Sequence, residues 1–435
     1  MKKFAPSPHG LRKVHPPSRR RVLLNVAAAS VATLAAPYVL AKQAAQVVVV
    51  GGGFAGATAA RTLARDGDGD IAVTLIEPQT QYTACPLSNA VVAGMRDLKA
   101  QQFGYDALDK DRIKRVSARA TGVDPTARRV TLEDGTQIDY DRLILAPGVD
   151  LRFDGLRGYD QKAAETMPHA WKAGAQTLLL RRQLEDMKDG GLVIISVPAN
   201  PYRCPPGPYE RASLIAHYLK TKKPRSKLMI LDGKDTFSKQ KLFEAAWKEL
   251  YPGLIEWVPL SSGGQVVEVD AATKTLVTDF GKHRAAVASV IPPQRAGEIS
   301  AIAGVADKTG WCPVDPVTFE SRLQPNIHVI GDAIIAGGMP KSAFAGNSQA
   351  KVCAGAVAQI LRGETPTAQK LINTCYSVVA PVYGISIASV FEPRDGLLTE
   401  VAGGVSPMDK PASFRAEEAR QAEAWFETIT RAVYG

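Results

Sequence analysis

A glycine-rich loop directly behind a β-branched run constrains this chain more than any other feature. Residues 47–50 are four consecutive valines, a pattern typical of a buried parallel strand. The loop that follows carries Gly51, Gly53 and Gly56, and a helix-like stretch begins at residue 57. Glycines at this spacing permit a tight turn and let a pyrophosphate approach the N-terminus of the helix.

The next segment completes the pattern. A second apolar strand is predicted over residues 71–76 and ends in Glu77, whose carboxylate can accept hydrogen bonds from ribose hydroxyls. Strand, glycine loop, helix, strand and acid in this order form the dinucleotide-binding fingerprint in its expected context. The sequence therefore predicts a nucleotide-binding domain at the start of the folded chain.

Two later segments indicate which nucleotide is bound. Residues 143–148, with Ala146 and Gly148 at the turn, resemble the strand-to-turn signature of FAD-dependent enzymes related to disulfide reductases. Residues 327–332 form an apolar strand ending in Gly331 and Asp332, like the motif whose aspartate binds the ribityl chain of FAD. Together with the first loop, these segments predict FAD bound by a discontinuous domain.

The second glycine loop expected of such flavoproteins is missing. A strand at 191–196 is followed by a proline-rich loop at 197–208 with no GxGxxG motif. Proline lacks the N–H group that a phosphate requires and stiffens the chain. A helix at 209–220 and a strand at 227–231 continue the pattern. We expect the second domain to keep the dinucleotide fold without its site, so NAD(P)H is not the expected electron partner.

The five cysteines carry the chemistry. They form no CxxC or CxxCH motif, so the sequence predicts no iron–sulfur cluster, no metal site and no c-type haem attachment. Cys204 lies in the proline- and glycine-rich loop just before a helix, and a helix N-terminus is expected to stabilise its thiolate. These residues alone leave the partner of Cys204 open among the other four cysteines, and a purely structural disulfide is the alternative.

At this point the chain resembles a known family, the flavoprotein subunit of flavocytochrome c sulfide dehydrogenase. The most specific stretches are 203–212, 291–297, 310–315 and 373–377. The resemblance implies a redox-active disulfide between Cys204 and Cys375. It also implies that Cys85 matches the cysteine joined by a thioether to the 8α carbon of FAD, with a buried packing residue as the alternative. Cys312 and Cys353 are left over and are predicted to be buried structural thiols.

The activity implied by the resemblance is oxidation of hydrosulfide to elemental sulfur or polysulfide, with electrons passed through FAD to a separate c-type cytochrome. Glu210 is a candidate acid/base residue, and a surface helix-cap carboxylate is the alternative. Residues 346–348, including Asn347, precede a predicted helix at 349–361. The N-terminus of that helix could stabilise negative charge near the reduced flavin, so Asn347 joins the predicted cofactor-binding residues.

The predicted fold class is α/β, a Rossmann-like flavoprotein with two dinucleotide domains, similar to glutathione reductase, and a C-terminal α+β domain that covers the flavin. The predicted boundaries are a signal at 1–41, the FAD domain at 46–155 and 291–363, the second Rossmann-like domain at 156–290, and the C-terminal domain at 364–435.

The first 41 residues look like an export signal. They carry seven Lys or Arg and no acid, followed by an alanine-rich apolar run. The stretch 18–23 resembles the twin-arginine signal, with a Sec signal or a basic tail as alternatives. Without these seven charges the net charge falls from +10 to +3, which gives no support to nucleic-acid binding. We expect a periplasmic protein exported in its folded state.

Two rival functions remain at the level of sequence. A sulfide:quinone oxidoreductase has a similar fold but needs a quinone pocket and a membrane-binding end. Here the apolar run 378–390 is interrupted by Pro381 and Gly384, and the amphipathic stretch 414–433 is typical of a core-packing helix, so an integral membrane protein is not expected. The second rival is an accessory redox subunit of a thiosulfate-oxidising system, which would tolerate loss of Cys204 or Cys375.

Overall fold

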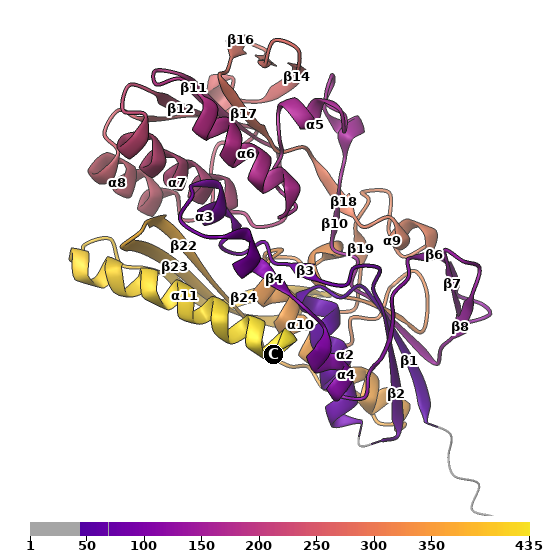
Figure 1. Ribbon diagram of the computed structural model, residues 1–435. Coiled ribbons are helices and arrows are strands. Elements are labelled where there is room, and N and C mark those ends of the chain that lie inside the picture. Colours follow the sequence, from indigo (N-terminus) through magenta and orange to yellow (C-terminus); the bar gives the residue numbers. More distant parts are fainter. Residues whose placement is uncertain (1–43, 68) are drawn as a thin grey trace, which may run out of the picture. The chain divides into compact units, whose positions relative to one another are not determined.

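The computed structural model describes residues 44–67 and 69–435 (Figure 1). The predicted export signal at 1–41 lies outside the described residues. The described chain contains two parallel sheets and a C-terminal antiparallel sheet. The predicted class, an α/β flavoprotein fold with two dinucleotide domains, is therefore confirmed. The exact domain boundaries stay predictions.

The first sheet has five parallel strands in the order β20-β9-β1-β2-β5. They are β1 (Ala45–Val50), β2 (Ile71–Ile76), β5 (Lys114–Val116), β9 (Arg142–Leu145) and β20 (Ile327–Val329). Helix α2 (Phe54–Asp66) packs against β1 and β2, and α10 (Ala343–Leu361) packs against α2. Val47 and Val49 are fully buried, as expected for a central strand covered on both faces. Because β20 pairs with β9 from far along the chain, this sheet is discontinuous in sequence.

An antiparallel strand pair connects the first sheet to the second. The chain leaves through β10 (Val149–Leu151) and returns through β18 (Gln294–Ala296), which pair with each other. The sheet between them has the order β13-β12-β11-β17. Its strands and helices are β11 (Leu192–Val197), β12 (Lys227–Asp232), β13 (Ile255–Val258), β17 (Val287–Val290), α6 (Ala175–Asp186), α7 (Gly207–Lys222) and α8 (Gln240–Leu250). Its parallel pairing without a glycine loop agrees with a dinucleotide fold that has diverged at its site.

Two helices begin earlier than the sequence predicted. Helix α7 starts at Gly207 instead of residue 209. A proline is tolerated in its first turn, because the backbone N–H groups of that turn have no acceptor within the helix. Helix α10 starts at Ala343 instead of residue 349, and the Ser342 hydroxyl caps it by accepting from the Ala345 N–H at 3.0 Å. Gly346 lies inside α10, where a Cβ would come within 3.3 Å of the Ala55 side chain. Close packing between α10 and α2 therefore outweighs the low helix propensity of residues 346–348.

The C-terminal part is a three-stranded antiparallel sheet with one long helix. It comprises β22 (Leu371–Ala380), β23 (Tyr383–Arg394), β24 (Leu397–Val405) and α11 (Ala412–Tyr434). Helix α11 lies along β22 and β23 and is the yellow helix of Figure 1. The apolar run 378–390 crosses the turn between β22 and β23. Val378 joins the core of the first sheet, whereas Val379 and Ile385 join that of the second, so this sheet packs against both.

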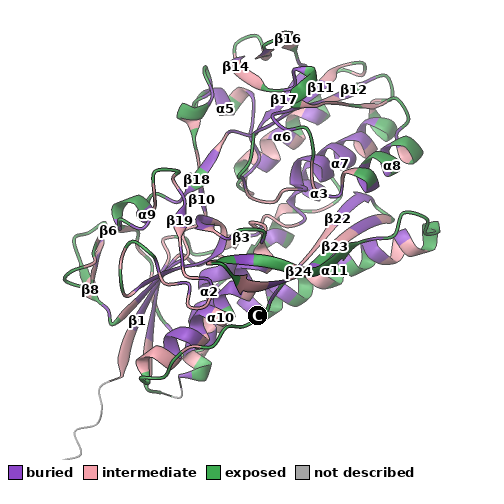
Figure 2. Ribbon diagram, turned by 180° about the vertical axis from the view of Figure 1, so that it is seen from behind, coloured by how far each residue is buried: buried purple, intermediate pink, exposed green. Residues whose placement is uncertain are grey.

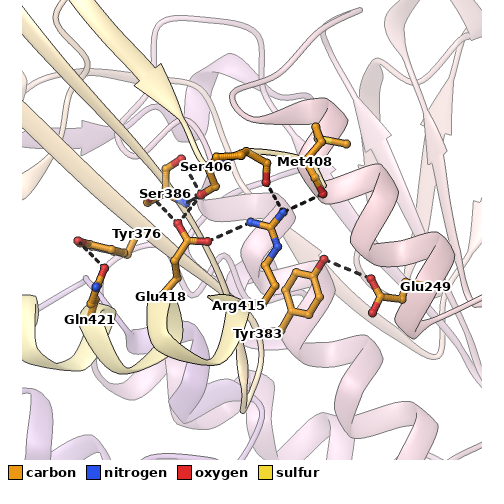
Figure 3. Close-up of polar contacts among 10 residues, drawn as sticks. Glu249, Tyr376, Tyr383, Ser386, Ser406, Met408, Arg415, Glu418 and Gln421 are labelled. Carbon is orange, nitrogen blue, oxygen red and sulfur yellow. Dashed lines mark hydrogen bonds and ion pairs between the residues drawn. The ribbon is translucent and has the colours of Figure 1, made fainter. Parts of the chain in front are cut away.

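A buried ion pair within α11 presents Glu418 to hydroxyls of the neighbouring sheet (Figure 3). The side chains of Arg415 and Glu418 are 3% and 5% exposed, and Nη1 lies 3.0 Å from Oε2. The hydroxyls of Ser386 and Ser406 donate to the other oxygen of Glu418. Arg415 also donates to the carbonyl of Pro407 at 2.6 Å. Because each charge is paired and hydrogen-bonded, the network fixes the position of α11 relative to the strands.

Shorter elements complete the described chain. They are β3 (Tyr82–Thr83), α3 (Ser88–Val92), β4 (Gln102–Phe103), α4 (Asp106–Lys110), β6 (Ala120–Asp124), β7 (Arg129–Leu132), β8 (Gln137–Asp139), α5 (Ala163–Thr166), β14 (Val266–Asp270), β15 (Thr275–Thr278), β16 (Gly281–Arg284), α9 (Ile299–Ile302), β19 (Cys312–Pro313) and β21 (Ile334–Ile335). Of these, α3 bears most directly on function, because it packs against α7 at the edge of the cavity described next.

Candidate active site

One cavity of about 400 Å³ collects most of the predicted site residues. The first sheet contributes the glycine loop at 51–53 and the ends of β2, β9 and β20. The part of the chain that contains the second parallel sheet contributes Trp171 and residues near the start of α7. The C-terminal part contributes residues 374–376 and Trp425. The cavity therefore lies where all three parts of the described chain meet.

The glycine loop takes the form that a bound pyrophosphate requires. Gly51 has a φ of 102°, and a Cβ there would lie 2.4 Å from the Ala146 carbonyl oxygen. At Gly56 a Cβ would lie 1.8 Å from the Gly51 oxygen, so α2 can approach the loop only with glycine at this position. Gly51 and Gly53 line the cavity, whereas Gly56 supports the loop from behind.

The acid that follows β2 is tied to the same loop. Glu77 accepts hydrogen bonds from the backbone N–H groups of Gly52 at 2.7 Å and Gln79 at 2.8 Å. It also lines the cavity, together with Ala146 and Gly148. Its carboxylate thus borders the cavity, and the binding of ribose hydroxyls by Glu77 stays a prediction.

At the end of β20, Gly331 and Asp332 also line the cavity. The Asp332 carboxylate accepts no hydrogen bond from any described residue, although its backbone carbonyl accepts one from Lys341. Burial raises the pKa of Asp332, and the cations Arg203 and Lys341 oppose that shift. An unpartnered carboxylate beside a glycine cradle fits the ribityl hydroxyls and pyrophosphate of FAD, which Asp332, Glu77 and residues 51–53 would hold.

One predicted cofactor residue lies elsewhere. The side chain of Asn347 is buried and donates to the Thr58 hydroxyl of α2 at 2.8 Å. It does not line the cavity, because α10 begins six residues earlier than expected and turns Asn347 toward α2. The part of α10 that faces the cavity is its start, Ser342 to Phe344, together with Gly346.

Cys204 and Cys375 come together at this cavity from distant parts of the chain. Cys204 precedes α7 with a left-handed φ of 59°, and its N–H donates to the Lys341 carbonyl at 2.8 Å. Cys375 lies in β22. All five cysteines lie within the described residues, and none of them is joined to another by a disulfide. The pairing of Cys204 with Cys375 stays a prediction.

The electrostatics of Cys204 differ from the expectation. Burial, together with the nearby Cys375 and Glu210, raises the pKa of the Cys204 thiol well above its usual range. Arg203 and Lys239 oppose this effect without reversing it. The predicted stabilisation of a Cys204 thiolate was therefore wrong, because burial raises the pKa of this thiol more than the neighbouring cations lower it.

The remaining cysteines lie in two different environments. Cys85 is half-buried, lines the cavity and lies 3.8 Å from the Trp171 carbonyl oxygen. Cys312 and Cys353 are fully buried, which confirms that they are buried thiols within the core. Burial raises the pKa of Cys312 to about 11 and that of Cys353 further still. Neither of them lines the cavity.

Glu210 is not a surface cap. It lies in the first turns of α7, which are buried almost throughout (Figure 2). Its carboxylate accepts from the Val378 N–H at 2.9 Å and from the Asn89 amide at 2.8 Å, and it lines the cavity. Burial raises the pKa of Glu210 despite these bonds. A buried carboxyl group with a raised pKa is suited to proton exchange at this wall.

Sequence reasoning missed several residues of this cavity. Arg211 is 2% exposed, donates to the carbonyls of His169 and Ala170, and stacks over Trp171 at 5.2 Å. It falls inside the family-like stretch 203–212, so that stretch could have pointed to it. Lys239 does not line the cavity, but its Nζ lies 4.0 Å from the Cys375 Sγ; its local sequence is that of an ordinary surface lysine.

In the second sheet, the strand-end position corresponding to Glu77 is filled by the chain itself. Asp232, the last residue of β12, is fully buried and accepts from the Tyr209 hydroxyl at 2.5 Å. Lys234 and Trp257 bind the same carboxylate at 2.5 and 3.0 Å. These contacts leave Asp232 no exposed oxygen for a ribose.

Comparison with known proteins shows which protein family the chain resembles. The model described as "Sulfide dehydrogenase [flavocytochrome c] flavoprotein chain, central" matches residues 177–292. The model described as "Flavocytochrome c sulphide dehydrogenase, flavin-binding" matches residues 367–434. A sulfide dehydrogenase [flavocytochrome c] flavoprotein chain from Chlorobaculum thiosulfatiphilum is 59% identical over 46 residues, which are 11% of this chain and 94% of that sequence.

The chain belongs to the family of flavocytochrome c sulfide dehydrogenase flavoprotein chains. It is accordingly an FAD-dependent sulfide oxidoreductase. The model described as "Pyridine nucleotide-disulphide oxidoreductase" matches residues 45–183, which contain the glycine loop, Glu77 and Cys85.

More distant relatives share the fold. The mouse protein "Sulfide:quinone oxidoreductase, mitochondrial" is 24% identical over 314 residues, covering 67% of this chain and 66% of the mouse protein. The solved structure of the sulfide:quinone oxidoreductase from Aquifex aeolicus matches with a TM-score of 0.71 at 19% identity, covering 89% of this chain and 92% of that one.

Two features are absent from the described residues. No helix among residues 44–67 and 69–435 is long and apolar enough to cross a membrane. Nor does that part of the chain contain a cluster of three or more His, Cys, Asp or Glu side chains that could hold a metal ion.

Proposed function

We propose that this chain oxidises hydrosulfide through a redox-active Cys204–Cys375 disulfide and passes the electrons through FAD to a c-type cytochrome. The product is elemental sulfur or polysulfide. The observation that carries the proposal is the meeting of Cys204, Cys375 and the buried Glu210 at the wall of the same cavity that contains the glycine loop and Asp332.

In the opening step, the sulfur of hydrosulfide attacks one sulfur of the disulfide. A new S–S bond forms as the old one breaks, which leaves a persulfide on one cysteine and a thiolate on the other. A second hydrosulfide then attacks the outer sulfur of the persulfide and releases disulfide dianion or its protonated form, the shortest polysulfide. Both cysteines are then reduced, so the pair has taken up two electrons.

The residues around the pair support this sequence. Glu210 has a raised pKa and a fixed position, so it can hold the proton of an incoming sulfide and return it to a cysteine. Arg203 lines the cavity and donates to the Trp171 carbonyl, which places a cation near the entry of an anionic substrate. When bound, FAD supplies the two-electron acceptor for the cysteine pair and can release electrons singly, as a cytochrome requires.

Covalent attachment of FAD through Cys85 is part of the proposal. Its thiol opens to the cavity, and its polar contact within the described chain is with the Trp171 carbonyl oxygen at 3.8 Å. A trichloroacetic acid precipitate that retains its yellow flavin, and loses it in Cys85→Ser, is the expected result. Flavin that appears wholly in the supernatant of the unmodified protein would overturn the attachment.

The choice of acceptor rests on the second sheet and on the family. NAD(P)H is disfavoured because Asp232 is occupied by Tyr209, Lys234 and Trp257. The family name pairs the flavoprotein chain with a flavocytochrome c, which supports a cytochrome acceptor. Export to the periplasm by the twin-arginine pathway is the matching location, and it rests on the sequence of residues 1–41 alone.

A quinone acceptor is the second candidate, favoured by the similarity to sulfide:quinone oxidoreductases. The two are separated by adding either a soluble c-type cytochrome or decylubiquinone to the sulfide-reduced protein and timing flavin reoxidation. Rapid reoxidation by the cytochrome supports the proposal, whereas rapid reoxidation by the quinone alone supports the alternative.

The central test is an anaerobic titration of the purified holoprotein with sulfide, followed through the visible flavin band. We expect bleaching in the unmodified protein and in Cys353→Ala, a matched control whose thiol is fully buried away from the cavity. Cys204→Ser should not bleach. Equal bleaching in Cys204→Ser would overturn the disulfide mechanism, and absence of bleaching in the unmodified protein would favour an accessory role in a thiosulfate-oxidising system.

A further inference from the structure

Lys239 is a buried lysine in contact with Cys375. It immediately precedes α8 in a left-handed conformation with a φ of 62°, and the residue is 7% exposed. Its ammonium donates to the Ser377 hydroxyl at 2.8 Å and to the Cys375 carbonyl at 3.3 Å. The Sγ of Cys375 lies 4.0 Å from Nζ. The lysine is thus held by two residues of β22, and its ammonium lies 4.0 Å from the sulfur of one cysteine of the pair.

This charge has no paired carboxylate. Among the described residues, none places a carboxylate oxygen within 4.0 Å of Lys239, although sixteen other ion pairs meet that limit. A buried ammonium without a counter-ion is costly, so such groups are usually neutralised by a partner. The nearby carboxylate, Glu210, is held instead by Val378 and Asn89. The ionisable group in direct contact with Lys239 is the Cys375 thiol.

The groups that face the two sulfurs make the pair asymmetric. Cys375 faces Lys239 from the turn before α8 and Glu210 from α7, and the lysine opposes the rise in the Cys375 pKa that burial causes. Cys204 faces Arg203, Glu210 and Cys375 itself, and Lys239 has the smallest influence of these on it. Burial raises the pKa of both thiols, but the compensating cation is in contact only with Cys375.

We infer that Lys239 is a positioning residue of the active site that stabilises the thiolate of Cys375 in the reduced pair. The inference rests on the proposed function for its catalytic meaning, but the thiolate itself can be measured without sulfide. It specifies which cysteine carries the negative charge after the disulfide opens. It also gives the buried lysine the counter-ion that the dithiol form lacks.

The test is the rate of iodoacetamide alkylation of the phosphine-reduced holoprotein as a function of pH. Trypsin separates the two cysteines, because Cys375 lies in peptide 371–394 and Cys204 in peptide 204–211. Only thiolates react, so each rate reports one ionisation. In Lys239→Met we expect Cys375 alkylation at pH 8 to slow by about tenfold, one pKa unit, with little change at Cys204.

Three variants separate electrostatics from folding. Lys239→Arg keeps the charge and should stay within about threefold of the unmodified rate. Lys241→Met removes an exposed lysine two residues away and should change nothing. The visible flavin band of each variant, recorded before phosphine is added, confirms an intact site. Unchanged alkylation of Cys375 in Lys239→Met, or equal slowing in Lys239→Arg, would overturn the inference.

The result is distinguishable from failure of the proposed function. One outcome is that sulfide fails to bleach the flavin while Lys239→Met still slows alkylation of Cys375. That result would reject the proposed function and support the inference that Lys239 stabilises the Cys375 thiolate. Normal bleaching of the flavin with unchanged alkylation of Cys375 would support the proposed function and reject the inference about Lys239.

Discussion

The two parallel sheets place an acid at matching strand ends, but the surroundings of the two acids differ. Glu77 follows β2 and binds only backbone N–H groups, those of Gly52 and Gln79, while it lines the cavity. Asp232 ends β12 and is fully buried beneath Tyr209, Lys234 and Trp257. The same topology thus keeps a nucleotide site in one case and fills it in the other.

The loops that precede these acids also differ, because the first leaves space for a nucleotide and the second does not. Gly51 and its neighbours leave room for phosphate oxygens against backbone N–H groups. The loop after β11 is rich in proline, and Phe237 stacks on Tyr209 at 3.6 Å close to Asp232. What a dinucleotide fold binds is therefore decided by the side chains at the strand ends, since the parallel strands alone are common to both.

The largest effect that would test this comparison is expected at Gly56. Gly56→Val would drive a side chain into the Gly51 carbonyl, already 1.8 Å from an ideal Cβ. We expect near-complete loss of bound flavin, measured as visible absorbance per protein. Gly355→Ala is the matched control, because a Cβ there meets nothing within 4 Å. Retention of flavin in Gly56→Val would show that the loop is not the pyrophosphate cradle.

The second effect contrasts the two acids directly. Asp232→Ala would leave Lys234 buried and unpaired, which costs about 3–5 kcal/mol. The expected fall in Tm is roughly 5–10 °C by scanning calorimetry. Glu77→Ala should lower Tm by only a few degrees, because two hydrogen bonds to backbone contribute about 1–3 kcal/mol, but it should reduce the flavin content. A larger fall in Tm for Glu77→Ala than for Asp232→Ala would contradict the assignment of roles.

The smallest effect concerns one buried histidine from each region. Burial lowers the pKa of His169 to about 3 and that of His328 to about 4. Each is neutral when folded, whereas the unfolded chain takes up a proton below about pH 6.5. The contribution of each neutral histidine to the free energy of unfolding is therefore fully present above pH 6.5 and decreases as pH falls. At pH 5 the loss is about 2 kcal/mol per histidine.

His169→Asn and His328→Asn provide the measurement. Each variant should lose less stability than the unmodified protein between pH 7.5 and pH 5.0, as a smaller difference in Tm. Any constant cost of the substitution cancels in that difference. Equal losses in variant and unmodified protein would show that the histidines are protonated in the folded state or exposed to solvent.

Local sequence was sufficient for the frame of the molecule. The four valines at 47–50, the glycines and Glu77 predicted β1, α2 and β2, because β-branched runs and tight glycine turns act over a few residues. The proline-rich loop at 197–208 likewise predicted the loss of the second site. Family-like stretches pointed to Cys204 and Cys375, although no spacing rule connects them.

Other features depended on contacts between distant segments. Asn347 was predicted at the flavin, but packing of α10 against α2 extended the helix and turned the side chain to Thr58. The Cys204 thiolate was predicted from a helix N-terminus, but burial reversed the sign of the pKa shift. Burial depends on every neighbouring segment, so a local pattern cannot report it.

Residue patterns alone predicted the first strands and helix, the glycine loop and the missing second loop, and the family-like stretches pointed to Cys204 and Cys375. Only the tertiary structure decided that Lys239 faces Cys375, that Glu210 is buried, and that Arg415 and Glu418 fasten α11 beside the cavity. The two groups of features differ in the distance over which the underlying interactions act. Backbone preferences act between neighbours in the chain, whereas desolvation and charge pairing act between neighbours in space.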